Sequence, residues 1–165
     1  MAEQIHYPLI FSYGDKVSGN GFLASVKVTG KALATEEDGL WWMSGVQPGG
    51  LLESGATPNE AFLSFRQKYG LILFDIAEES HSFDEFKNLV EKFFGETNES
   101  EENLWAEAHS LIKAGKVVPK EPFSELRKSS LTFCKIGIHV TRLDNSNKHQ
   151  TSDNVSDTVI LPLAA

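Results

Sequence analysis

Apolar and polar residues alternate along several stretches of the chain, which predicts the strands of one sheet. Residues 22–29 carry apolar side chains at every second position, as a strand with one buried face does. Residues 39–46 are rich in aromatic and aliphatic residues, and the acidic turn at residues 36–39 joins the two strands as a hairpin. A last strand is predicted within residues 131–143, with Cys134, Ile136, Ile138 and Val140 pointing inward.

Three other stretches have apolar positions spaced close to 3.6 residues and predict helices. The first covers residues 58–78 and begins with the capping-box pattern TPNE at residues 57–60. A second helix, residues 83–94, has Ser82 as its cap, and a third covers residues 101–114. The stripe that the long helix turns toward the sheet contains Phe62, Phe65, Tyr69, Ile72 and Ile76.

The two ends of the chain have weaker patterns. Residues 7–13 are a short apolar run that predicts an added strand or an ordered arm, followed by a loop that reaches residue 20. Residues 144–154 are polar and predict a loop. Residues 158–163 predict an edge strand, because Pro162 cannot donate a hydrogen bond to a strand on its amide side.

The composition is that of one globular domain over residues 1–165, with 41% hydrophobic and 23% charged residues. No apolar run approaches the ~20 residues that cross a bilayer, so no membrane association is expected. The N-terminus lacks the pattern of a secretory signal, and the single cysteine, Cys134, cannot form an internal disulfide. These features favour a cytoplasmic location.

The order of elements in residues 39–69 resembles the HicB antitoxin family, whose members run from a glycine-aromatic strand through a Pro-Gly turn into a G-x-T-x-x-E-A helix. Here the strand is followed by the turn at residues 48–50, a short strand at residues 51–54, and the sequence SGATPNEA. Residues 116–122 resemble the proline-bearing link of that family, and residues 131–143 resemble its last strand.

The resemblance implies an α+β fold with a degenerate ribonuclease H-like ββ(β)αβ core, in which a long helix covers one face of the sheet. The core would comprise residues 20–78 and 116–143 of a single HicB-like domain. The two further helices would form an insertion at residues 82–115.

The resemblance also implies a function, which is to bind a small HicA-type mRNA-cleaving toxin and inhibit it sterically. Many members continue into a DNA-binding module, but after residue 143 this sequence is too short and too poor in helical pattern for one, so operator binding is not expected. Two alternatives stay open. The chain could be an interaction or scaffolding domain without a toxin partner, or an enzyme whose site is assembled from distant residues.

The charge of the chain bears on its partners. A net charge of −8, from 15 basic and 23 acidic residues, opposes binding to phosphate backbones. The same charge suits a basic, toxin-like protein, because opposite potentials accelerate encounter. Self-association is the other partner that the sequence leaves open.

Catalytic residues are not evident. Ribonuclease H chemistry requires several carboxylates around metal ions, yet the strand at residues 21–28 has Lys27 as its one charged residue. The five histidines are never spaced three or four residues apart, and no nucleophile or phosphate-loop motif is present. We therefore expect a protein without catalysis, metal or cofactor.

The candidate partner-binding residues are Trp41, Trp42 and Met43. Adjacent residues of a strand point to opposite faces, so one tryptophan faces the long helix and the other faces away from it. The inserted helices could cover the outward tryptophan. Alternatively, it forms an aromatic strip for a partner or a second copy, where tryptophan is a favoured contact residue.

Overall fold

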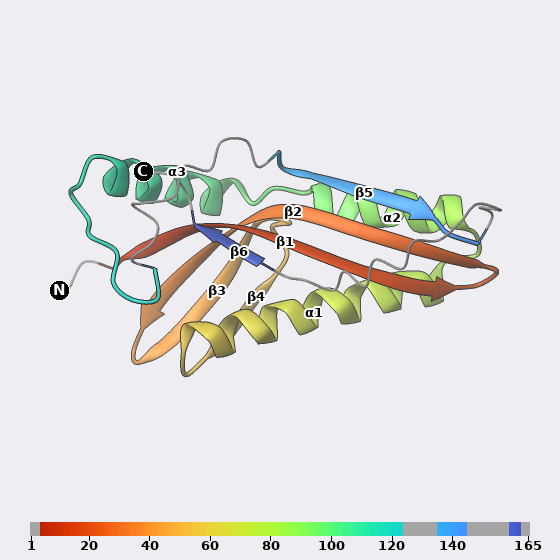
Figure 1. Ribbon diagram of the computed structural model, residues 1–165, viewed down its shortest axis with the longest axis horizontal. Coiled ribbons are helices and arrows are strands. Elements are labelled where there is room, and N and C mark those ends of the chain that lie inside the picture. The colour runs from red at the N-terminus through yellow and green to blue at the C-terminus, as the bar shows by residue number, and fades with distance from the viewer. Residues whose placement is uncertain (1–3, 124–134, 145–158, 163–165) are drawn as a thin grey trace.

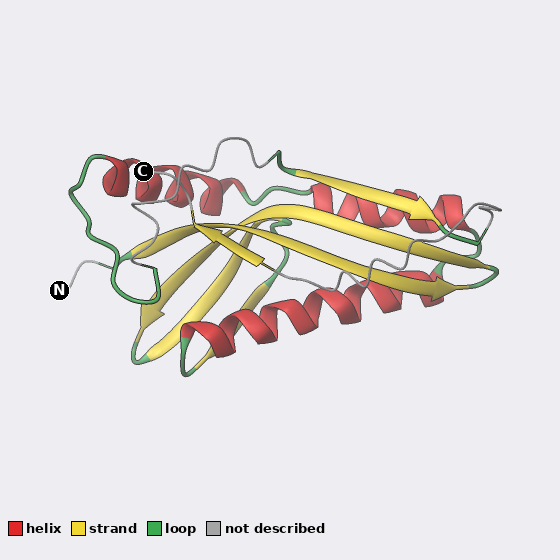
Figure 2. Ribbon diagram, in the orientation of Figure 1, coloured by secondary structure: helices red, strands yellow, loops and turns green. Residues whose placement is uncertain are grey.

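The structure is a computed structural model that describes residues 4–123, 135–144 and 159–162. Within these residues, six strands form one sheet in the order β4-β3-β2-β1-β6, with β5 also paired to β2, and every pairing is antiparallel. Three helices pack around it (Figures 1 and 2). The elements are β1 (His6–Gly19), β2 (Phe22–Glu37), β3 (Leu40–Gln47), β4 (Leu52–Gly55), α1 (Pro58–Glu79), α2 (Phe83–Gly95), α3 (Glu99–Lys113), β5 (Gly137–Arg142) and β6 (Val159–Pro162).

The long β1–β2 hairpin is the frame of the sheet. Its register runs without interruption from His6 opposite Thr35 to Gly19 opposite Phe22. The other edge of β2 pairs with two strands: β5 with its first half and β3 with its second half. The register shifts between Lys31 and Ala32, where the pairing with β3 begins.

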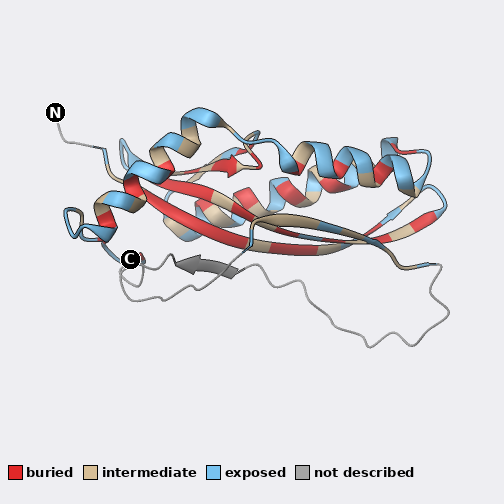
Figure 3. Cartoon of the chain, turned by 90° about the horizontal axis from the view of Figure 1, so that it is seen from above, coloured by how far each residue is buried: buried red, intermediate tan, exposed pale blue. Residues whose placement is uncertain are grey.

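The main core lies between the sheet and the helices α1 and α2. Alternate residues of β1 and β2 point to this face, which we call the α1 face, and they pack against one side of each helix. Figure 3 shows the buried residues of the strands and helices in red. The ring of Tyr69 in α1 contacts Phe11 of β1 at 5.4 Å and Phe94 of α2 at 4.9 Å between centroids. The fully buried side chains of the two helices are Ala61, Phe65, Tyr69, Leu73, Ala77, Phe86, Val90 and Phe94.

The helix α3 covers part of the opposite face, which we call the α3 face. There Ile10, Leu33 and Val46 pack around Trp105 of α3. The indole Nε1 of Trp105 donates a hydrogen bond to the Leu9 carbonyl at 3.2 Å. The sheet is therefore covered by helices on both faces.

Two polar contacts fasten α3 to the sheet at the edge of this cluster. The ammonium of Lys31 lies 2.8 Å from a carboxylate oxygen of Glu102 and 4.4 Å from the ring centroid of Trp105. The hydroxyl of Ser44 donates to Glu101 at 2.8 Å. Both acids belong to the first turn of α3, where negative charge also favours the helix dipole.

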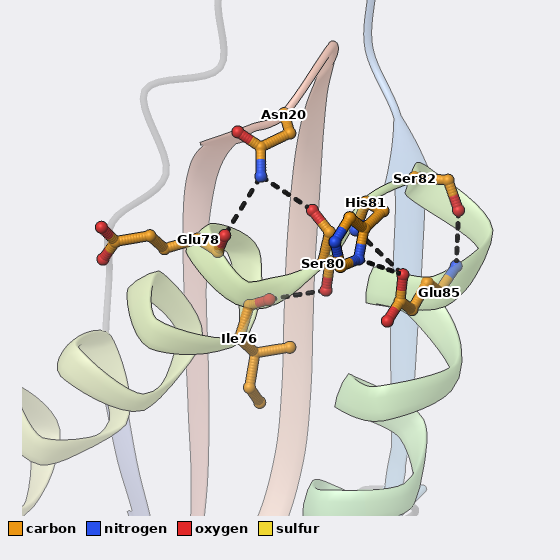
Figure 4. A network of polar contacts seen from close by, with 7 residues as sticks. All are labelled: Asn20, Ile76, Glu78, Ser80, His81, Ser82 and Glu85. Atoms are coloured by element: carbon orange, nitrogen blue, oxygen red, sulfur yellow. Dashed lines mark hydrogen bonds and ion pairs between the residues drawn. The ribbon is translucent and has the colours of Figure 1, made fainter.

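The turn between β1 and β2 holds the connection between α1 and α2 in place (Figure 4). Asn20 Nδ2 donates to the carbonyl oxygens of Glu78 and Ser80, at 3.1 and 2.9 Å. Ser80 is fully buried, and its hydroxyl donates to the Ile76 carbonyl. Asn20 thus satisfies two carbonyls at the end of α1, where the last carbonyls of a helix lack partners within the helix.

The Pro48-Gly49-Gly50 turn is fixed by the segment that joins α2 to α3. Gly49 N donates to the Glu96 carbonyl, and Asn98 N donates to the Val46 carbonyl, both at 2.9 Å. A Cβ added at Gly49 would lie 2.4 Å from the Asn98 backbone nitrogen, whereas one at Gly50 would lie 3.7 Å from the Phe93 ring. The close approach therefore requires glycine at position 49 but not at position 50.

The predicted N-cap residues of the first two helices, Thr57 and Ser82, are confirmed. Thr57 Oγ1 accepts from Glu60 N at 3.2 Å, and Ser82 Oγ accepts from Glu85 N at the same distance. The glutamate of each capping box accepts from the amide before the cap, and not from the amide of the cap residue as predicted. Glu60 Oε2 accepts from Ala56 N, and Glu85 Oε2 accepts from His81 N. The third helix begins two residues earlier than predicted, because its cap is the side chain of Asn98.

The predicted loop after residue 13 is wrong. The structure continues β1 to Gly19, and only residues 20–21 turn the chain, with Gly21 at a φ of 79°. The predicted edge strand at residues 158–163 is confirmed as β6, which pairs with residues 9–12 of β1. In the last predicted strand, residues 137–142 are confirmed, whereas Cys134 and most of the polar tract 144–154 lie outside the described residues.

The structure is therefore a mixed α+β fold, with an antiparallel sheet, a long helix on one face and two further helices, as the sequence predicts. Its strand pairings do not establish the ribonuclease H-like arrangement. No helix in the described part of the chain is long and apolar enough to span a membrane.

Candidate functional site: an acidic cleft with an aromatic wall

A cleft of about 720 Å³ opens at the tip of the β2–β3 hairpin. The hairpin tip and Trp41 form one side, and residues 4, 5, 7, 120 and 121 complete the lining. The cleft therefore forms where the segment after α3 comes back beside the start of the chain and the β2–β3 hairpin.

The hairpin turn is made by Asp38 and Gly39, whose φ angles are 52° and 78°. Positive φ at both central residues matches the right-handed twist of the flanking strands and favours an Asp-Gly pair. Across this turn Glu36 pairs directly with Trp41, so both side chains project from the same face of the sheet. The turn thereby sets a carboxylate beside an indole.

Three aromatic rings form the wall of the cleft and the layer behind it. Tyr7 stacks on Phe123 with ring centroids 4.7 Å apart and planes at 22°. Trp41 lies 6.0 Å from Tyr7 and 5.7 Å from Phe123. Tyr7 and Phe123 are buried, whereas Trp41 is half-buried and lines the cleft, so the packed pair supports an indole that solvent can reach.

The charge of the cleft is strongly asymmetric. Its lining includes four exposed carboxylates, Glu36, Glu37, Asp38 and Glu121, and one ammonium, Lys120. Burial raises the pKa of the Tyr7 hydroxyl, and the charge of Glu36 raises that pKa further, although a backbone hydrogen bond with Lys120 opposes the shift. Such a cleft attracts cations.

The combination suits a guanidinium or ammonium group. A cation over an indole face gains about 0.5–1 kcal/mol when exposed and about 2 kcal/mol when desolvated. Carboxylates at the rim add charge-assisted hydrogen bonds, which are roughly twice as strong as neutral ones. The arrangement can therefore hold an arginine or lysine side chain of a partner.

The structure separates the three residues that the sequence proposed for partner binding. Trp41 lies on the α1 face and lines the cleft. Trp42 points to the opposite face, as alternation predicts, and it is half-buried there. Met43 is 1% exposed and packs in the main core, so it cannot contact a partner directly.

Sequence reasoning did not identify Tyr7, Glu121 or Phe123 as parts of this site. The sequence predicts Tyr7 only as part of the first apolar run and Glu121 only as part of the link at residues 116–122, and it assigns no role to Phe123. Their approach to Trp41 depends on the register of β1 against β2 and on the path of the chain after α3. No local pattern in the sequence encodes either feature.

Groups that could perform catalysis are dispersed. Among the described residues, no three His, Cys, Asp or Glu side chains lie close enough together to hold a metal ion. His6 Nδ1 lies 2.8 Å from Thr35 Oγ1, and His81 Nδ1 lies 3.3 Å from Glu85 Oε2. His109 stacks on an indole ring. Each of these three histidines is thus held by its own neighbour, and they do not form a common site.

Comparison of this chain with protein-family models, curated proteins and solved structures gave no match.

Proposed function

We propose that this protein is a non-catalytic, HicB-like antitoxin that binds a small, basic HicA-type mRNA-cleaving toxin and inhibits it sterically in the cytoplasm. The order of β3, the Pro-Gly-Gly turn, β4 and the capped helix α1 supports the proposal, because it reproduces the sequence pattern of residues 39–69 that resembles this family. In this proposal the sheet and α1 are a degenerate ribonuclease H-like core.

The acidic cleft is the observation on which the proposal mainly rests. A ribonuclease that acts on messenger RNA must present basic side chains to phosphates. A cleft with four carboxylates beside Trp41 would capture such a side chain and cover the RNA-binding face of the toxin. Inhibition then requires no chemistry from this chain.

Co-expression with a short basic protein encoded beside this gene tests the proposal. We expect the neighbouring protein to arrest growth alone and to be neutralised by this chain. Trp41→Ala and Glu37→Lys, which alter the cleft, should abolish the rescue. The matched control Glu79→Lys reverses the same charge at an exposed residue at the end of α1 and should preserve the rescue.

Purified proteins provide the quantitative arm of the test. The complex should weaken as salt rises, because exposed charges are screened over about 8–10 Å at physiological ionic strength. Unchanged binding by both cleft variants would contradict the proposed site. A neighbouring protein that is harmless and does not bind would contradict the antitoxin function.

The alternative is an interaction domain that has kept the fold without a toxin partner. The position of helix α3 favours this alternative. Contacts of Trp105, Lys31 and Ser44 hold α3 over part of the α3 face, so a toxin could not bind to that part of the sheet. Binding to basic proteins without ribonuclease activity, through the same Trp41-dependent cleft, would support this alternative over the antitoxin function.

A further inference from the structure

A second cavity lies on the α3 face of the sheet, beside the start of β1. Its volume is about 430 Å³, within the range of about 300–1,000 Å³ that is typical of ligand pockets. Helix α3 and the segment that follows it provide most of the lining. The apolar side chains of this lining, with one from the residue before β1, are Leu104, Ala108, Leu111, Val117, Val118 and Ile5. We call this cavity the apolar pocket.

The polar residues of the apolar pocket leave its charge balanced. Glu107 and Lys116 contribute one charge of each sign, and Gln4 is uncharged. His6 also lines the pocket, but its Nδ1 is engaged 2.8 Å from Thr35 Oγ1. The pocket therefore suits an uncharged apolar group, whereas the acidic cleft suits a cation.

The apolar pocket and the acidic cleft are neighbours. Gln4 and Ile5 line both cavities. The segment after α3 also lines both, the pocket with residues 116–118 and the cleft with residues 120–121. Figure 1 shows this segment running from the end of α3 past the start of β1. A ligand that leaves one cavity along these shared residues therefore reaches the other.

The two cavities open on opposite faces of the sheet. His6 and Tyr7 are adjacent in β1, so their side chains point to opposite faces. His6 lines the apolar pocket, and Tyr7 lines the acidic cleft. A chain that passes from one cavity to the other has to cross the end of one strand. This crossing is on the order of 10 Å, which about three or four extended residues span at ~3.3 Å each.

A basic side chain alone would be held weakly in the acidic cleft. The carboxylates of the cleft are exposed, and exposed ion pairs contribute little because water and salt screen them. Most of the affinity of a specific interface comes from a few large side chains that fill desolvated pockets. A partner of the cleft therefore needs an apolar anchor close by, and the apolar pocket provides a place for one.

We infer that one segment of the partner fills both cavities, with a basic side chain in the acidic cleft and a large apolar side chain, about three or four residues away, in the apolar pocket. The inference rests on the proposed function, in which the cleft receives a basic side chain of the toxin. It adds the second half of the recognised motif. Linking the two contacts makes the second one intramolecular, so the pair binds more tightly than either contact alone.

Titration of the full chain with a synthetic peptide tests the inference without the toxin. The probe is a peptide with one arginine and one leucine separated by about three glycines. Its two controls have serine in place of the leucine or of the arginine. In nuclear magnetic resonance spectra, the probe should shift the indole signal of Trp41 and the methyl signal of Ala108 together. It should bind about tenfold or more tightly than either control, because only the probe reaches both cavities.

A variant of the apolar pocket provides the second arm of the test. Val118 is 62% exposed, so Val118→Glu should fold normally, and it places a carboxylate where an apolar group is expected. The variant should weaken binding of the probe about tenfold. The leucine-free control peptide should bind it no more weakly than it binds the wild type, since an added carboxylate does not repel arginine. Leu111→Ala serves as the second variant should Val118→Glu misfold.

Leu52→Glu is the matched control variant. Leu52 is 58% exposed and lines neither cavity, so this change should leave binding of the probe as it is in the wild type. Three results would overturn the inference. The Ala108 signal could stay unshifted, the leucine-free peptide could bind as tightly as the probe, or Val118→Glu could affect binding of the probe no more than Leu52→Glu does.

These results are separable from the test of the antitoxin function. Rescue from the neighbouring protein that is lost with Trp41→Ala but kept with Val118→Glu would preserve the proposed function and overturn the two-cavity motif. A harmless neighbouring protein would contradict the antitoxin function, and the peptide titration would still decide whether one segment fills both cavities.

Discussion

The hydroxyl of Tyr69 provides the sharpest test of how the core is packed. This side chain is 1% exposed, and its oxygen has no hydrogen-bond partner among the residues that the structure describes, although the ring itself contacts Phe11, Phe65 and Phe94. A buried polar group without a partner costs about 1–3 kcal/mol relative to its hydrated state. Tyr69→Phe keeps the ring and removes that cost.

We expect Tyr69→Phe to raise the free energy of unfolding by about 1 kcal/mol, near the lower end of that range because the lost oxygen leaves a small void. For a chain of this size the thermal midpoint should rise by about 2–4 °C. Denaturant titration provides the free energy, and thermal melting checks it. A clear loss of stability would mean that the hydroxyl is hydrogen-bonded and that this account of the core is wrong.

Tyr13→Phe is the matched control. The hydroxyl of Tyr13 donates to an Asp15 carboxylate oxygen at 3.0 Å, so its removal breaks a hydrogen bond. This variant should lose about 1 kcal/mol. Opposite signs for the same chemical change at two neighbouring rings would show that hydrogen bonding, and not the tyrosine ring, decides the effect.

The pH dependence gives an independent test at the same position. Burial raises the pKa of Tyr69 well above its ordinary value of 10.0. Above pH 10 this tyrosine ionises in the unfolded chain while it stays protonated in the folded one. This difference leaves the stability of the wild type unchanged below pH 10 and lowers it as pH rises above 10, by up to about 1.4 kcal/mol per pH unit. The gap between Tyr69→Phe and the wild type should therefore widen in alkali, and a constant gap would contradict the raised pKa.

The remaining predictions concern stability at local contacts. Gly49→Ala should cost about 1–3 kcal/mol, because its Cβ would meet the Asn98 backbone at 2.4 Å, whereas Gly50→Ala should cost much less; equal midpoints in denaturant would refute the required close approach. Thr57→Ala and Ser82→Ala should each cost about 1 kcal/mol, since each hydroxyl accepts a hydrogen bond from a helix amide at 3.2 Å. A cap variant with an unchanged midpoint would show that this hydrogen bond adds nothing in solution.

Features set by neighbouring residues could be predicted from the sequence. The caps at Thr57 and Ser82 depend on a hydroxyl three residues before an amide, and the long helix depends on apolar spacing that the structure confirms at Phe65 and Tyr69. The strand error at residues 14–19 has a local cause as well. Apart from Val17, these residues are small or polar and look like a loop, yet the Asn20-Gly21 pair is the turn signal.

Features set by the path of the chain could not be predicted. The cleft brings Tyr7 to Trp41 through the register of β1 and β2, and Phe123 joins them only because the segment after α3 returns to the start of the chain.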